Sequence, residues 1–243
     1  MAADINARQA LHLDVISDTI CPWCYVGKRH LEAALRTLAT EGFAYEIHWR
    51  PFQLNPDMPK EGRDRRAYRS AKFGSWEKSL ALDAQVASAG AAEGLQFHHE
   101  LMAKTPNTLA SHILIRLAHE IGGATLQDRV VEALFAAYFT LGRDVGDAQV
   151  LADIGQAAGI DCAVTLAALE KPANRAAVTE DEKLARRLGL NGVPSIVLKG
   201  QYLFSGAQPV STIVTALREA SARSASLHPH VPSSSEVGYG VIR

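Results

Sequence analysis

Cysteine is scarce in this chain, which has three cysteines among 243 residues. So few thiols exclude a framework of structural disulfides. A zinc or iron–sulfur site needs about four ligands, and no histidine pair at ligand spacing lies near the cysteines to complete such a set. We therefore predict no metal site, and expect the cysteines either to perform thiol chemistry or to be inert and buried.

An excess of charge of one sign is also missing, because 25 Lys and Arg balance 26 Asp and Glu to a net charge of -1. This balance gives no reason to expect nucleic acid or an anionic membrane as a partner. No segment approaches the roughly 18 uninterrupted apolar residues of a membrane span, and residues 1–10 have no apolar core of signal-peptide length. With 47% hydrophobic residues, we expect a cytoplasmic globular protein with a substantial core.

Two of the three cysteines stand in the stretch Cys21-Pro22-Trp23-Cys24, where an apolar strand over residues 11–16 runs into a helix. Two cysteines separated by two residues in this setting are typical of a thiol–disulfide redox site. Pro22 fits the first position of a helix, so Cys21 falls at the helix N-terminus, where unpaired amides and the helix dipole favour a thiolate. We predict that Cys21 is the nucleophile. Cys24, one turn further in and more shielded, would attack the mixed disulfide and release the product.

Two further residues bear on the chemistry of the cysteines: Tyr25, which follows the motif, and Cys162, the third cysteine. Attachment of c-type haem needs a histidine directly after the second cysteine, and Tyr25 stands there instead. Cys162 follows Asp161 at the start of a predicted helix. We interpret Cys162 as a structural residue, although a position at a helix start leaves reactivity open.

The two ends of the chain predict strands, and the middle predicts helices. A strand over 11–16, a helix over 22–40 and a strand over 43–52 form one unit, in which the helical crossover implies parallel strands. Near the other end, residues 194–205 predict a hairpin and residues 209–222 a closing helix. Between these units lie alanine-rich segments with helical periodicity, separated by glycines: residues 65–73, 75–93, 108–121, 126–140, 148–159, 162–170 and 172–188.

The helical stretch is far too long to be a loop within one compact unit. We therefore infer a helical domain inserted into a unit of β-α-β and β-β-α parts, which gives an α/β fold class. Residues 1–61 and 190–222 are expected to form one discontinuous domain, and residues 62–189 an all-helical inserted domain. Residues 223–243, rich in proline and serine, are expected to be a flexible tail.

Several short motifs occur in order along residues 11–220: Ser17-Asp18 before Cys21-Pro22-Trp23-Cys24-Tyr25, Arg50-Pro51-Phe52 to Asn55-Pro56, Asn107-Thr108 with His112, Ala137-Tyr138-Phe139, Gly192-Val193-Pro194, and Ser205-Gly206-Ala207. As an ordered set they resemble the DsbA family of thioredoxin-fold proteins, most closely its cytoplasmic branch, which includes 2-hydroxychromene-2-carboxylate isomerase-like proteins. The resemblance implies a thioredoxin fold with a helical insertion, a redox-active Cys21/Cys24 pair, and a cis peptide bond between Val193 and Pro194 that faces this pair.

The Val193-Pro194 bond also has an interpretation of its own. Only a bond that precedes proline takes the cis form at low cost, and a tight turn leading into a strand is where it is retained. An ordinary trans proline at the start of a strand is the alternative. In the cis form, the Val193 backbone would be presented to an extended peptide or a small thiol held across Cys21. We expect Pro22, Trp23 and this Val193-Pro194 turn to support the site.

Two acids flank the end of the strand before Cys21. Either Asp14 or Asp18 could accept a proton from Cys24, as a buried acid does in the thioredoxin-like proteins that the chain resembles. Neither acid lies at the usual offset from the cysteine, and surface or turn-capping acids are the alternative. Asp18 is retained as a predicted support of the active site.

The helical region carries the remaining candidates. Asn107 and His112 are predicted to line a substrate pocket between the helical domain and the redox site. The alternative is that His112 is a boundary residue satisfied by its neighbours. His98 and His99 are expected on the surface.

Two function classes remain. The first is a thiol–disulfide oxidoreductase that forms a mixed disulfide with a protein or small-molecule thiol substrate and needs no cofactor. The second is a glutathione-dependent isomerase or transferase of the 2-hydroxychromene-2-carboxylate isomerase type, with glutathione as co-substrate. Related isomerases tend to have serine at the position of Cys21. Because a resolving thiol is useless to simple glutathione activation, retention of Cys24 favours the oxidoreductase. A redox-controlled chaperone is compatible with this first class.

The cellular redox potential predicts a direction. A cytosolic glutathione potential of roughly -220 to -320 mV would keep a DsbA-like pair at about -120 mV reduced. In the cytoplasm we therefore expect a reductase or disulfide isomerase, unless an oxidant couples to the enzyme.

Overall fold

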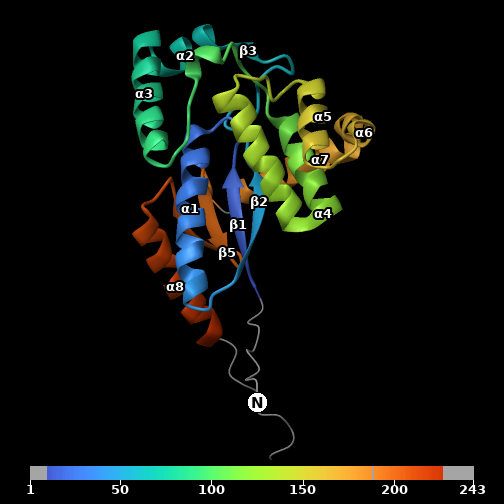
Figure 1. Ribbon diagram of the computed structural model, residues 1–243. Coiled ribbons are helices and arrows are strands. Elements are labelled where there is room, and N and C mark those ends of the chain that lie inside the picture. Colours follow the sequence, from blue (N-terminus) through green and yellow to red (C-terminus); the bar gives the residue numbers. More distant parts are fainter. Residues whose placement is uncertain (1–9, 188, 227–243) are drawn as a thin grey trace, which may run out of the picture.

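A four-stranded sheet forms the centre of the protein, whose computed structural model describes residues 10–187 and 189–226 (Figure 1). The strands lie in the order β2-β1-β5-β6, with β1 and β2 parallel and the other pairs antiparallel. Three helices and four strands belong to this part of the chain: β1 (Leu11–Ser17), α1 (Pro22–Thr40), β2 (Tyr45–Pro51), β5 (Ser195–Leu198), β6 (Gln201–Ser205), α8 (Val210–Ser226), and α7 (Pro172–Arg187), which packs on β2. The mixed α/β thioredoxin-like arrangement predicted from the sequence is confirmed.

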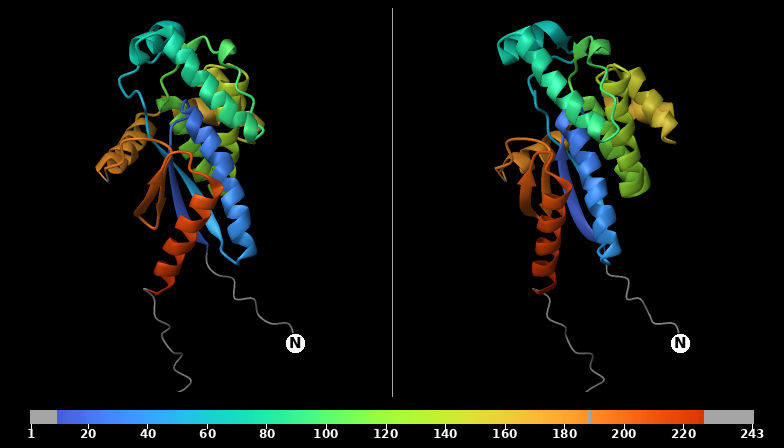
Figure 2. Two further views of the ribbon diagram at one scale, coloured as in Figure 1. Left: turned by 90° about the vertical axis from the view of Figure 1, so that its left-hand side faces the viewer. Right: turned by 60° about the vertical axis from the view of Figure 1, so that its left-hand side comes forward.

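Apolar side chains on β1 explain how the sheet is covered. Leu13 and Val15 are buried on one face of the strand, as alternation along a strand requires. Helices α1 and α8 pack against each other and lie side by side along the sheet (Figure 2). Leu31 and Leu38 of α1 and Leu217 of α8 are almost fully buried in the same core. This core fixes the start of α1, and with it the Cys21 loop, relative to the sheet.

The region between β2 and β5 is largely helical. In chain order it contains β3 (Arg63–Asp64), α2 (Arg65–Phe73), α3 (Trp76–Ala92), the short helix η1 (His99–Leu101), β4 (Lys104–Thr105), α4 (Leu109–Phe135), η2 (Ala136–Thr140), α5 (Ala148–Ala157), α6 (Cys162–Glu170) and α7. Among the described residues, none of these segments joins the central sheet, as predicted. The expectation of an all-helical region is wrong in one detail, because β3 and β4 pair with each other over two residues.

Helix α4 connects the helical region to the sheet. The helix bends at Gly122 and Gly123, whose backbone angles are not helical, at the glycine where the sequence predicts a break. Beyond the bend, the Gln127 side chain accepts from the Trp49 amide at 2.9 Å and donates to the Trp49 carbonyl at 3.0 Å. Asp128 accepts from the Trp49 indole at 3.0 Å. These bonds cover the outer edge of β2, which would otherwise present unpaired backbone groups. One core cluster includes side chains of both the sheet and α4, and the domain boundaries at 61/62 and 189/190 stay a prediction.

The end of the chain differs in part from expectation. Helix α8 continues through Ser226, so residues 223–226 are helical and do not belong to a tail. The rest of the predicted tail, residues 227–243, lies outside the described residues. Within the described ranges, none of the helices combines the length and apolarity that crossing a bilayer needs.

Candidate active site

Cys21 is the N-cap residue of α1. Its backbone is extended, its amide donates to the Asp18 carbonyl at 3.0 Å, and its own carbonyl accepts from the Cys24 amide at 3.0 Å. Pro22 occupies the start of the helix, and no side chain caps the N-terminal amides. The unpaired amides and the dipole of a 19-residue helix therefore act on the Cys21 sulfur, as the sequence predicts.

The two cysteines differ in their surroundings. Both are free thiols, and their exposed fractions are 5% for Cys21 and 1% for Cys24. Burial raises the pKa of Cys24 well above its ordinary value, and the neighbouring Cys21 raises it further. Hydrogen bonds from the Ser17 side chain and the Asp18 backbone act in the opposite direction. Cys24 therefore stays protonated in the dithiol form, and Cys21 at the helix N-terminus is the sulfur available for attack.

The Val193-Pro194 turn faces Cys21. The peptide bond is cis, and the Cys21 thiol donates to the Val193 carbonyl at 3.7 Å, across 172 positions of sequence. Helix α1 approaches the same turn so closely that a Cβ on Gly27 would lie 3.1 Å from Cγ of Pro194. The predicted contact between the two distant motifs is confirmed. Trp23, with 37% of its surface exposed, lies between the two cysteines in the motif.

Asp18 and His112 form a buried pair next to the CxxC loop. Asp18 has no exposed surface, and His112 is 3% exposed. Oδ2 of Asp18 accepts from the Leu54 amide at 2.7 Å. Oδ1 lies 3.5 Å from Nε2 of His112, and neither of these two atoms has a hydrogen-bond partner. Buried polar atoms without a partner are rare and call for an explanation.

A second polar contact holds the same loop against α4. The hydroxyl groups of Thr19 and Ser111 lie 2.8 Å apart in a buried setting. Ser111 also donates to the Thr108 carbonyl at 2.8 Å. The sequence analysis missed Thr19 and Ser111, because nothing local indicates that the segment before Cys21 meets α4 some 90 residues later.

The structure separates the other predicted candidates. Asp14 is paired with Arg50, whose Nε lies 2.6 Å from Oδ1, so Asp18 is the acid that remains next to the cysteines. Asn107 donates to the Met58 carbonyl at 2.6 Å and lines a cavity of about 450 Å³. His112 lines a different cavity, of about 90 Å³. The prediction that Asn107 and His112 share one pocket is therefore wrong.

Three further residues complete the comparison with the sequence. His98 is 43% exposed at its side chain, as expected, whereas His99 is only 12% exposed and lies 3.8 Å from Asp83. The prediction that His99 is a surface residue is wrong, because η1 turns it inward. The Cys162 thiol donates to the Ala152 carbonyl at 3.6 Å in the first turn of α6.

A cavity lies against the proline-rich segment that follows β2. Its volume is about 850 Å³, and it is lined by Leu54, Asn55, Pro56, Asp57, Met58, Arg63, Asp64, Ala67, Tyr68, Ala71 and Lys72. The bond from the Leu54 amide to Asp18 connects this lining to the loop that carries Cys21. The sequence indicates only a loop here, and α2 supplies the opposite wall.

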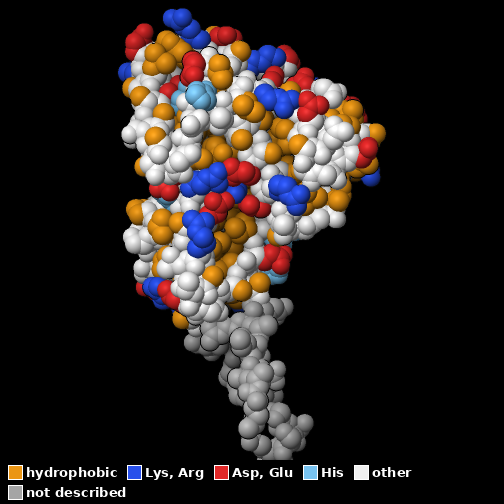
Figure 3. Space-filling model, viewed as in Figure 1, with side chains coloured by type: hydrophobic (Ala, Val, Ile, Leu, Met, Phe, Trp, Pro, Cys, Tyr) orange, Lys and Arg blue, Asp and Glu red, His pale blue; other side chains and the backbone are white. Residues whose placement is uncertain are grey.

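A dense ion cluster lies one turn beyond the cysteines. Nζ of Lys28 contacts Glu32, Asp128 at 3.2 Å and Glu132 at 3.1 Å. Arg29 also binds Glu132. Charged side chains of both signs accordingly gather between α1 and α4 on the face shown in Figure 3.

Tyr25, directly after Cys24, belongs to the same cluster. Its hydroxyl donates to Glu132 at 2.9 Å. Burial and the negative charge of Glu132 raise the pKa of Tyr25. Its ring packs on Phe135 at a centroid distance of 5.0 Å, so the hydroxyl stays a proton donor that holds α1 against α4.

Several solved structures share the fold of this chain. A probable DsbA oxidoreductase from Streptomyces coelicolor is 32% identical, with a TM-score of 0.78 over 87% of this chain and 90% of that chain. A 2-hydroxychromene-2-carboxylate isomerase is 15% identical, with a TM-score of 0.66 over 90% and 100% of the two chains. The cytosolic disulfide reductase DsbM from Pseudomonas aeruginosa, solved with GSH, is 19% identical, with a TM-score of 0.60 over 88% and 100%.

The last two likenesses concern the fold alone, since their identities are low. The model of the DSBA-like thioredoxin domain matches residues 12–218, which include the CxxC loop, the helical region and the Val193-Pro194 turn. The chain therefore belongs to the family of DSBA-like thioredoxin domains, a family of thiol oxidoreductases.

Proposed function

We propose that this protein is a thiol–disulfide oxidoreductase that works through Cys21 and Cys24. The observation that carries the proposal is the position of the Cys21 sulfur. It lies at the N-terminus of α1, faces the Val193 carbonyl at 3.7 Å, and has the fully buried Cys24 one turn behind it. A nucleophile at a helix start and a more deeply shielded second thiol are what a two-step exchange requires.

The reaction proceeds in two exchanges. The Cys21 thiolate attacks one sulfur of a substrate disulfide, so a Cys21–substrate disulfide forms and the other substrate sulfur leaves as a thiolate. Cys24 then gives up its proton and attacks the Cys21 sulfur. The substrate leaves with both of its sulfurs reduced. The two electrons come from the cysteine pair, which is oxidised to a Cys21–Cys24 disulfide.

Asp18 and His112 are proposed to take part in the second step. Cys24 must lose a proton although burial raises its pKa. The Asp18 backbone donates a hydrogen bond to Cys24, while Oδ1 of its side chain remains unpartnered beside His112. A buried carboxylate with one free oxygen, next to an imidazole, can accept a proton from the resolving thiol through a water molecule.

Glutathione is proposed as the thiol that returns the pair to the reduced state. Two glutathione molecules supply the two electrons and become one glutathione disulfide. The bound GSH in the DsbM structure supports this choice, and the cytosolic location given for DsbM supports a cytoplasmic location and a reductase direction here. The isomerase alternative is supported only by the similarity of fold. The presence of both Cys21 and Cys24 favours the oxidoreductase, because simple glutathione activation does not need a resolving thiol.

Substrate disulfides are proposed to lie across the Cys21 sulfur, with their backbone along the Val193 carbonyl. Trp23 and Leu54 are each 37% exposed, and Leu54 lines the cavity of about 850 Å³. An extended peptide segment of a protein suits this surface better than a compact molecule, because the Val193 carbonyl can bind its backbone and Trp23 and Leu54 can contact its apolar side chains.

Three variants test the proposal. Cys21→Ser is expected to abolish the reduction of insulin disulfides, whereas Cys24→Ser is expected to accumulate mixed disulfides, because it loses resolution but not attack. Cys162→Ser is the matched control, and its rate should equal that of the wild type. Mass spectrometry of intact protein counts the adducts. Retention of most activity by Cys21→Ser would overturn the assignment of the nucleophile.

A further inference from the structure

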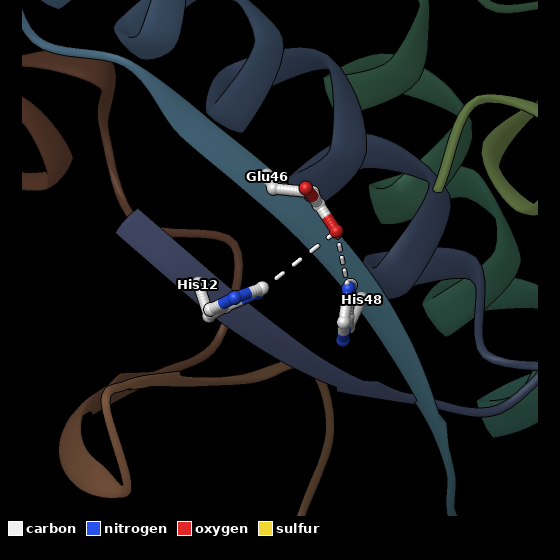
Figure 4. Close-up of side chains that lie close together, drawn as sticks. All are labelled: His12, Glu46 and His48. Carbon is white, nitrogen blue, oxygen red and sulfur yellow. Dashed lines mark hydrogen bonds and ion pairs between the residues drawn. The ribbon is translucent and has the colours of Figure 1, made fainter. Parts of the chain in front are cut away.

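Three potential metal ligands meet at the end of the sheet opposite to Cys21. The parallel register of β1 and β2 places His12 beside Glu46, and His48 stands two residues further along on the same face of β2. Nε2 of His48 lies 2.8 Å from Oε1 of Glu46, and Nδ1 of His12 lies 3.9 Å from the same oxygen. Figure 4 shows the three side chains turned toward one another from the two strands.

The three ligand atoms lie within 4.8 Å of one another. Within the part of the chain that the structure describes, this is the one group of three or more His, Cys, Asp or Glu residues with such spacing. The side chain of His48 is 15% exposed, while that of His12 is 61% exposed and lies edge-on to the His48 ring at a centroid distance of 5.1 Å. The group therefore combines a mostly buried histidine, His48, with a solvent-exposed one, His12.

A fourth side chain extends the cluster. His119 of α4 stacks edge-on against His48, with ring centroids 4.6 Å apart. Its Nδ1 is buried and has no hydrogen-bond partner. A buried imidazole nitrogen without a hydrogen-bond partner in the protein calls for an explanation.

The charges around the cluster suit a cation. The nearest arginines are both bound to carboxylates of their own: Arg50 to Asp14 at 2.6 Å, and Arg116 to Glu120 at 2.9 Å. The Glu46 carboxylate is thus the charge that faces His12 and His48. Among the described residues, the ion pairs of Glu46 are those with His12 and His48, and none joins it to a lysine or arginine.

We propose that His12, Glu46 and His48 bind a divalent transition metal of the zinc class. Two imidazoles and one carboxylate, with a water molecule in the fourth position, are a common ligand set for Zn²⁺. Tetrahedral bonds of about 2.0 to 2.2 Å place the ligand atoms roughly 3.4 Å apart. The His12 nitrogen, 3.9 Å from the Glu46 oxygen, must therefore move closer, while the His48 nitrogen, 2.8 Å from the same oxygen, must move slightly away.

The site is separate from the redox pair. His12 stands near the start of β1, and five residues of strand at about 3.3 Å each place it roughly 17 Å from the end that leads to Cys21. Because Zn²⁺ also binds thiolates, an experiment must separate the two sites. The full-length chain with Cys21, Cys24 and Cys162 replaced by Ser, and without an affinity tag, removes this competition.

Isothermal titration of this cysteine-free protein with Zn²⁺ is the test. We expect one Zn²⁺ per chain. His12→Ala, Glu46→Gln and His48→Ala should each weaken binding at least 10- to 100-fold, the loss that even an orienting neighbour of a ligand causes at zinc sites. His12 is exposed, so its replacement does not disturb the core, and thermal unfolding checks the other two. Mg²⁺, which prefers oxygen ligands, should not bind.

A matched control is available on the surface. Nδ1 of His98 lies 3.0 Å from Glu100, which gives a His–carboxylate pair without a third ligand. His98→Ala should leave the Zn²⁺ affinity unchanged. The absorption spectrum with Co²⁺ in place of Zn²⁺ should lack a thiolate band and change only in the His12, Glu46 and His48 variants. The proposal is overturned if the cysteine-free chain does not bind Zn²⁺, if the three variants bind as tightly as the parent, or if His98→Ala weakens binding equally.

Discussion

Two buried clusters of ionisable side chains lie beside the cysteines, and they are built differently. Lys28 is 3% exposed at its side chain and contacts three carboxylates, so its charge is fully compensated. Asp18 and His112 are as deeply buried, but they lie 3.5 Å apart with one unpartnered atom each. A structural ion cluster needs complete pairing to offset the loss of hydration. A group that must accept or release a proton needs an atom that is free to bind it, and we therefore propose that the incomplete pair is the functional one.

Replacement of Lys28 should have the largest effect on stability. Lys28→Met leaves Glu32, Asp128 and Glu132 facing one another without their common partner. We expect the free energy of unfolding to fall by about 3 kcal/mol, at the low end for a broken buried pair because the carboxylates are about one-third exposed. Urea unfolding measures it. Lys183→Met, which breaks an exposed pair with Glu180, is the control and should cost less than about 1 kcal/mol. Equal losses would contradict the account.

Asp18→Asn should affect chemistry more than stability. The amide oxygen can still accept from the Leu54 amide, so we expect the free energy of unfolding to change by about 1 kcal/mol or less. Attack of Cys24 on a preformed Cys21 mixed disulfide should slow about 100-fold, the lower range for loss of a general base. Stopped-flow release of a chromogenic thiol reports this step. Asp14→Asn is the control, and a similar slowing in both variants would refute the role of Asp18.

Acid should reduce the stability that the ion cluster around Lys28 contributes. Burial alone raises the pKa of Glu132, but the hydrogen bond from Arg29 and the charge of Lys28 outweigh it and the pKa is lowered. The folded state therefore gains stability from Glu132 above the pKa of an unfolded glutamate, about 4.3, and loses it as pH falls through the lower folded pKa. Unfolding curves between about pH 5 and pH 3 should decline less in Glu132→Gln, by about 1 kcal/mol. Parallel curves would show that Glu132 does not contribute.

The Thr19–Ser111 contact should give the smallest change. Ser111→Ala leaves the buried Thr19 hydroxyl without its partner and should cost about 1 kcal/mol. Thr19→Val should cost less, because the Ser111 hydroxyl keeps its bond to the Thr108 carbonyl. Thermal unfolding of the two variants checks this order. The reverse order would mean that the hydroxyl groups do not share the bond as the structure has it.

The features that depend on neighbours in sequence were predictable. Cys21 at the N-cap, Pro22 in the first turn and the break of α4 at Gly122 each follow from a local preference. The Val193-Pro194 turn was predictable because proline restricts the backbone and because the family resemblance supplied its partner. Local preferences also predicted the helices between β2 and β5.

The features that depend on register and packing were not predictable. His12, Glu46 and His48 meet only because β1 and β2 pair in one particular register, which no single strand specifies. The Asp18–His112 contact spans 94 positions and requires the placement of α4 against the CxxC loop. Asn107 and His112 stand five residues apart near the start of α4, but they point into different cavities.

The central claim is that Cys21 and Cys24 act as one dithiol–disulfide pair. Equilibration of the wild-type protein with reduced and oxidised glutathione, followed by acid quenching and intact-mass measurement, tests it most directly. The account predicts a single two-electron transition from two thiols to one intramolecular disulfide, with a loss of two hydrogens and no persistent adduct. A stable glutathione adduct on Cys21 with Cys24 still a thiol would contradict it and favour the glutathione-dependent isomerase.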